Sequence, residues 1–96
     1  MKLEDKLISL IKDAVRNINN IPEEDMPPIH LELPKEKQHG DLATNIAMQL
    51  ASRFKLSPQE IAAKVAAFMN EGLKSASLNR NIAKIEVKGP GFINFF

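Results

Sequence analysis

Hydrophobic residues recur every three or four positions in three stretches of the chain. This spacing is typical of helices that bury one face. The first stretch begins the chain, the second follows Gly40, and the third follows Ser57-Pro58. The pattern predicts helices over residues 2–18, 41–54 and 58–71, of which the second contains no charge from Leu42 to Ser52 and is expected to be central in the core.

The predicted helix boundaries carry their own local signals. Asp41 stands where its carboxylate would accept a hydrogen bond from the free amides of the second helix. Ser57 and Glu60 have the spacing of a capping box, and Pro58 occupies the first helical position. Gly72 is expected to end the third helix.

Strict alternation of apolar and polar residues predicts strands at 29–33, 83–88 and 91–96. Gly89-Pro90-Gly91 separates the last two, and so short a link allows only an antiparallel hairpin. We therefore expect an α+β fold: a small antiparallel sheet, made of the C-terminal hairpin plus one earlier strand, with three main helices packed on one face. Ninety-six residues are enough for one domain, 1–96, and leave no room for a second core.

The last strand has apolar bulk on both faces. Ile93 and Phe95 share one face, which we assign to the core, whereas Phe92, Asn94 and Phe96 share the other. In one interpretation a helix or another domain covers this second face, and Asn94 finds a backbone partner. In the other, a nucleobase stacks on a ring while the amide binds its edge. Aromatic residues on strands belong mostly to cores, so the pattern alone favours the first interpretation.

The formal net charge of +1 gives no overall attraction to nucleic acid or membrane. Its distribution is uneven, because residues 72–96 hold four basic residues and the single acid Glu86. Solvated surface lysines are the commoner explanation of such a pattern. The candidate phosphate contacts are Lys35, Lys37, Arg80, Lys84 and Lys88.

Several kinds of chemistry have no basis in the sequence. Without cysteine, neither a disulfide nor a thiolate metal site can form. His30 and His39 are not at ligand spacing, and no nucleophilic grouping stands out, so we expect no catalytic residue, metal or cofactor in this chain. There is no apolar run of membrane length and no signal peptide, which predicts a cytoplasmic protein without a membrane partner.

Two blocks of sequence together resemble a known family. Residues 39–47, His-Gly-Asp-Leu-Ala-Thr-Asn-Ile-Ala, resemble the "HGD-aT-N-A" signature near the start of arginyl-tRNA synthetases. Residues 87–96 resemble the "GPGFINF" signature that follows it in that family, and the capping-box helix between the blocks is also familiar there. The order matches, and the resemblance covers nearly the whole chain.

The resemblance implies an N-terminal additional domain, an α+β module that grips the outer corner of tRNA-Arg and contacts its D-loop. In that family an aromatic residue and an amide, two positions apart on the last strand, engage an identity base. The matching residues here are Phe92 and Asn94.

The resemblance also implies a longer enzyme, an arginine–tRNA ligase of translation that uses arginine and ATP with Mg²⁺. Its HIGH-like and KMSKS-like signatures are absent from this sequence. The catalytic and anticodon-binding domains are therefore expected outside these 96 residues, with the catalytic domain and tRNA-Arg as partners and the monomer as the expected state.

Two other classes of function stay open. The chain could be a protein-interaction or assembly module, with Phe92 and Phe96 as a hydrophobic contact patch. It could also bind nucleic acid non-specifically through the face of Phe92, Asn94 and Phe96. Salt dependence and preference among tRNAs separate the three classes, because an assembly module ignores tRNA and a non-specific binder does not distinguish one tRNA from another.

Overall fold

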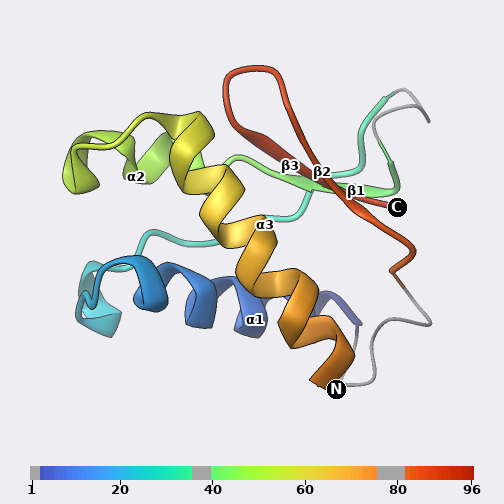
Figure 1. Ribbon diagram of the computed structural model, residues 1–96, viewed down its shortest axis with the longest axis horizontal. Coiled ribbons are helices and arrows are strands. Elements are labelled where there is room, and N and C mark those ends of the chain that lie inside the picture. Colours follow the sequence, from blue (N-terminus) through green and yellow to red (C-terminus); the bar gives the residue numbers. More distant parts are fainter. Residues whose placement is uncertain (1–2, 36–39, 76–81) are drawn as a thin grey trace.

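The computed structural model describes residues 3–35, 40–75 and 82–96 (Figure 1). It combines helices with a three-stranded antiparallel sheet, so the predicted α+β class is confirmed. The elements are α1 (Leu3–Ile18), the short 3-10 helix η1 (Glu23–Asp25), β1 (Leu42–Thr44), α2 (Ile46–Phe54), α3 (Pro58–Ser75), β2 (Ile85–Lys88) and β3 (Phe92–Phe95).

The sheet has the order β1-β3-β2, with the last strand in the middle. β2 and β3 form the predicted hairpin, in which Val87 is the partner of Ile93. On the other side β1 pairs antiparallel with β3, and Ala43 is the partner of Asn94. The two blocks that carry the family resemblance therefore meet as neighbouring strands.

The predicted strand at 29–33 is wrong. The segment makes only an isolated bridge, in which the Glu32 amide donates to the Ala43 carbonyl (2.8 Å) and the Ala43 amide donates to the Glu32 carbonyl (2.9 Å). The place beside β3 belongs to β1, so this segment reaches only the outer edge of the sheet. Its alternation marks a buried side only in part, since Ile29 belongs to the core and Leu31 packs against it, whereas Leu33 is 81% exposed.

The second helix begins later than predicted, because residues 42–44 are strand β1. A spacing of four residues is also a multiple of two, so Leu42 and Ile46 fit a helix and a strand equally well. Asp41 does not cap the helix; its backbone amide donates to the Phe95 carbonyl at 2.8 Å. The N-cap is Asn45, which makes no side-chain capping bond, while Thr44 Oγ1 accepts from the Ile46 amide at 3.3 Å.

Gly40 brings β1 against β3. Its φ of +90° lies in a region that L side chains rarely adopt, and a Cβ there would come within 2.6 Å of the Phe95 carbonyl oxygen. Only glycine permits this close approach without moving the backbone. The glycine of the first signature block is thus needed for the close contact with Phe95 of the second block.

The central helix is α3, contrary to the prediction that the second helix takes this place. α3 contacts α1, α2, β2 and β3. Its start is as predicted, because the Glu60 amide donates to Ser57 Oγ at 3.2 Å. Gly72 does not end it; a Cβ on Gly72 would lie 3.1 Å from Cδ2 of Leu10, so the glycine serves close packing between α3 and α1.

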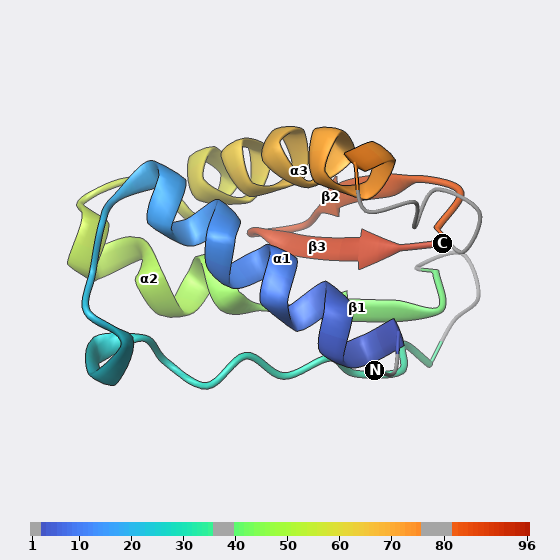
Figure 2. The same cartoon turned by 90° about the horizontal axis from the view of Figure 1, so that it is seen from below.

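The helices pack against one face of the sheet, as Figures 1 and 2 show. Ile93 and Phe95 of β3 point into this layer and are 0% and 1% exposed, which confirms their assignment to the core. The other large, fully buried apolar side chains are Leu7, Ile11, Val15, Ile46, Leu50, Ile61, Val65 and Met69.

No helix in the described part of the chain is long and apolar enough to cross a membrane.

Candidate nucleic-acid interface

The side of the sheet that faces away from the helices, here called the outer face, carries the residues that the sequence singled out. In the β2–β3 hairpin, Lys88 is the partner of Phe92 and Glu86 is the partner of Asn94. The pairing continues beyond β3, since the Phe96 amide donates to the Lys84 carbonyl at 3.0 Å. Cross-strand partners share a face of a sheet. The outer face of the hairpin therefore presents Lys84, Glu86, Lys88, Phe92, Asn94 and Phe96.

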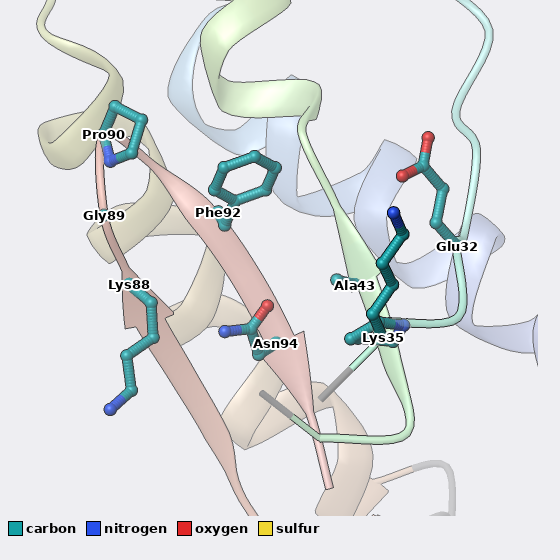
Figure 3. A pocket seen from close by; sticks show the side chains of 9 residues that line it. Glu32, Lys35, Ala43, Lys88, Gly89, Pro90, Phe92 and Asn94 are labelled. Carbon is teal, nitrogen blue, oxygen red and sulfur yellow. The ribbon is translucent and has the colours of Figure 1, made fainter. Parts of the chain in front are cut away.

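A pocket of about 360 Å³ lies on the outer face (Figure 3). Segments far apart in the sequence build it: the β2–β3 hairpin, β1, and the stretch that bridges to β1. Four of the predicted contact residues line it together. The lining residues are Glu32, Pro34, Lys35, Ala43, Lys88, Gly89, Pro90, Phe92 and Asn94.

Phe92 offers an accessible ring to this pocket. Its side chain lies on the same side of β3 as that of Asn94 (Figure 3). It is 39% exposed, and Leu33 is the other large hydrophobic residue exposed among the described residues. The sequence prediction that Phe92 and Asn94 share a face opposite the core is confirmed.

Asn94 is buried, although it shares this face. It is 3% exposed and lies on the central strand, between its cross-strand partners Glu86 and Ala43. Among the described residues no side-chain nitrogen or oxygen is fully buried without a hydrogen bond, and none of the hydrogen bonds found there joins the Asn94 amide to a backbone group, so its polar atoms reach the pocket. The backbone partner of the first interpretation is thus not found there, and the amide is part of the pocket wall.

Lys84 and Lys88 both bind Glu86. Lys84 Nζ lies 2.8 Å from one carboxylate oxygen of Glu86, and Lys88 Nζ lies 3.2 Å from the other. The hydrogen bond from Lys84, followed by that from Lys88, lowers the pKa of Glu86. Lys84 Nζ also lies 4.4 Å from the centre of the Phe96 ring, a cation–π distance. We call Lys84, Glu86 and Lys88 the charge triad.

The hairpin turn at one end of the pocket is fixed against α3. Gly91 has φ +136°, and a Cβ on it would lie 2.7 Å from the Pro58 Cβ. The glycine therefore allows the turn to lie directly on the first residue of α3. The start of the capping-box helix and the wall of the pocket are one packed unit.

Some predicted residues are not tested, and some lining residues were missed. Lys37 and Arg80 lie outside the described residues. Glu32, Pro34 and Ala43 were not predicted for the site, because their place depends on contacts between distant segments. The charge triad could have been inferred, since residues 84, 86 and 88 alternate onto one face of a strand. Among residues 3–35, 40–75 and 82–96, no group of three His, Asp or Glu side chains could hold a metal ion.

The chain is a small α+β domain, with helices on one face of the sheet and a pocket lined by an aromatic ring and an amide on the other. Residues 5–96 match the family described as the arginyl tRNA synthetase N terminal domain, and the chain belongs to this family. The resemblance stated from the two sequence blocks is thereby confirmed.

Similar proteins are named arginine–tRNA ligases. The one from Listeria welshimeri is 45% identical over 91 residues, which are 95% of this chain and 15% of that protein. The one from Oceanobacillus iheyensis is 46% identical over 93 residues, 97% of this chain and 16% of that protein. The one from Bacillus licheniformis is 41% identical over 95 residues, 99% of this chain and 16% of that protein. The chain thus spans about a sixth of the length of these relatives.

Proposed function

We propose that residues 1–96 form the tRNA-binding N-terminal domain of an arginine–tRNA ligase, which contacts the D-loop corner of tRNA-Arg and supports ATP-dependent arginylation by the full-length enzyme. One observation carries this proposal. The pocket on the outer face combines an accessible aromatic ring, Phe92, with a buried amide, Asn94. The names of the relatives agree with it.

The pocket has the chemistry to hold an extruded loop base. A base can stack on the Phe92 ring, while the Asn94 amide donates to and accepts from the base edge. Because Asn94 is buried, a base has to enter the pocket to reach it. Lys35 and Lys88 line the same pocket, where their ammonium groups can bind the flanking phosphates.

The reaction itself belongs to other parts of the enzyme in this proposal. Arginine and ATP with Mg²⁺ bind to the catalytic domain, and residues 1–96 contribute binding of tRNA without an active site or cofactor. The domain works in the cytoplasm, without a membrane partner, as part of a monomeric ligase whose catalytic domain it adjoins.

Replacing Asn94 tests the proposed function most directly. We expect Asn94→Ala in the full-length enzyme to relax the preference among D-loop bases, because the amide carries the discrimination while stacking accepts any base. The measurement is kcat/KM for arginylation of tRNA-Arg transcripts in which the D-loop nucleotides are replaced one at a time. Wild type should lose efficiency at one D-loop position, and the variant should lose less there. A wild-type enzyme that accepts every D-loop base equally would contradict the proposal.

The lysines of the outer face lead to a prediction about salt. If their ammonium groups neutralise phosphates, binding of tRNA-Arg weakens linearly with salt on logarithmic axes. Replacing Lys84 and Lys88 together with alanine should flatten this slope, by about 0.7–0.9 for each phosphate that the variant no longer neutralises. Filter binding of the full-length enzyme over a salt series measures it. An unchanged slope would place the phosphate-binding residues elsewhere, and a wild-type enzyme that binds all tRNAs alike would favour the non-specific alternative.

A further inference from the structure

Glu86 contacts the candidate site in two ways, through strand pairing and through ion pairs. It is the cross-strand partner of Asn94, whose amide lines the pocket. Its two carboxylate oxygens bind the ammonium groups of Lys84 and Lys88, one each. The carboxylate therefore stands directly beside the pocket and between the two cations of the hairpin.

This arrangement changes what the two lysines offer to RNA. Each ammonium has three N–H donors, so one bond to Glu86 leaves donors for a phosphate. The charge triad as a whole has a net charge of +1, whereas two unpaired lysines would present +2. Glu86 keeps its negative charge at neutral pH, since hydrogen bonds from Lys84 and then Lys88 lower its pKa.

Glu86 also orders the lysines. Lys84 Nζ lies 2.8 Å from a carboxylate oxygen of Glu86 and 4.4 Å from the centre of the Phe96 ring, and both contacts favour this arrangement of the side chain. Long side chains lose conformational entropy when they bind a phosphate, and side chains that are already ordered lose less. The carboxylate thus has two opposing effects on RNA binding. It repels phosphates, and it lowers the entropy cost of binding phosphates that fit the ordered positions of the two lysines.

We propose that Glu86 is a specificity-determining residue, which weakens the binding of RNA that does not insert a base into the pocket. This inference rests on the proposed function. Non-specific affinity comes from neutralised phosphates and is the same for every RNA, so the repulsion by Glu86 acts on it fully. In the complex with tRNA-Arg the repulsion is offset, because the ordered lysines meet phosphates fixed by the inserted base. Glu86 therefore lowers non-specific binding more than specific binding.

Glu86→Gln in the full-length enzyme tests the proposal, because glutamine keeps the size and removes the charge. The probes are a tRNA-Arg transcript and a tRNA transcript of another amino acid, each titrated over a salt series. We expect the non-cognate tRNA to bind about fourfold tighter at low salt, the effect of one charge removed about 5 Å from a phosphate in water. Its salt slope should become steeper, and binding of tRNA-Arg should improve less, so that the ratio of the two affinities falls.

Glu71→Gln is the matched control. Glu71 lies on α3, is 81% exposed and pairs with Lys74 at 4.0 Å, so the substitution makes the same change in net charge away from the outer face. We expect it to leave the ratio of affinities unchanged. If both variants strengthen non-cognate binding equally, the effect is one of total charge and the proposal for Glu86 is overturned.

Two further outcomes would also overturn it. One is an equal loss of affinity for both tRNAs with a lowered melting temperature, which would show that Glu86 only supports the hairpin. The other is an unchanged non-cognate affinity. Failure of the proposed function would be seen in a separate arm: wild type and Phe92→Ala would then show the same ratio of affinities, whatever Glu86→Gln does to non-cognate binding.

Discussion

Phe92→Ala in the full-length enzyme is expected to lower kcat/KM for arginylation of tRNA-Arg roughly tenfold to a hundredfold. The reason is that stacking of a base on an aromatic ring contributes on the order of 1–3 kcal/mol. The loss should be specific to tRNA, because the arginine and ATP sites of the proposed enzyme lie elsewhere. Steady-state arginylation with varied tRNA measures it, and ATP–diphosphate exchange by the same variant shows whether the amino-acid step is intact.

Phe92→Leu distinguishes stacking from packing. Leucine keeps the apolar bulk at a position that is 39% exposed, but it has no flat π face. If stacking is the contribution, Phe92→Leu loses most of what Phe92→Ala loses. If the leucine variant keeps wild-type efficiency, the ring acts by bulk alone and the base-stacking part of the proposal is wrong.

Phe95→Ala is expected to have the largest effect on stability. Phe95 is 1% exposed, in the core between the sheet and the helices, and Phe→Ala in such a site costs about 3–5 kcal/mol. Small domains have about 5–15 kcal/mol of stability in total, so the loss is a large fraction of it. Urea unfolding of the 96-residue chain, followed by circular dichroism, measures the change.

Phe92→Ala is the control for that experiment, since the two residues are close in sequence and on opposite faces of β3. We expect it to change the unfolding free energy far less than Phe95→Ala. Equal losses would mean that Phe92 is also a core residue. The interface proposal would then fail, whatever the arginylation measurements show.

The parts of the fold that the sequence predicted correctly depend on local signals. The capping box at Ser57, the apolar face of α1 and the Gly-Pro-Gly turn each act within a few residues. The largest errors concern two segments: β1, which was predicted as part of a helix, and residues 29–33, which were predicted as a strand of the sheet. β1 pairs with β3, and the segment 29–33 makes only a bridge to β1. That choice is made by contacts over about fifty residues of sequence, among them the Gly40 backbone against Phe95.

The candidate site divides in the same way. Alternation along one strand placed Phe92 and Asn94 on the same face, and the family resemblance implied a role for the pair in contacting a base of tRNA. The burial of Asn94 could not be predicted, because it follows from Ala43 and Glu86 on its two sides. The ion pairs of Glu86 with Lys84 and Lys88 could have been predicted, because residues 84, 86 and 88 alternate onto one face of a strand.

The position of β3 has a consequence for the order of events during synthesis. β3 is the middle strand of the sheet, yet it follows both of its partners, β1 and β2, along the chain. As the ribosome makes the chain from its N-terminus, α1, α2 and α3 are complete before β3 exists, and β1 has no partner strand until then. Pairings between distant segments also form more slowly than local helices. The candidate pocket should therefore be the last part of this fold to assemble. A nascent chain would form its helical layer first, and the pocket that we propose to bind tRNA only when β3 completes the sheet.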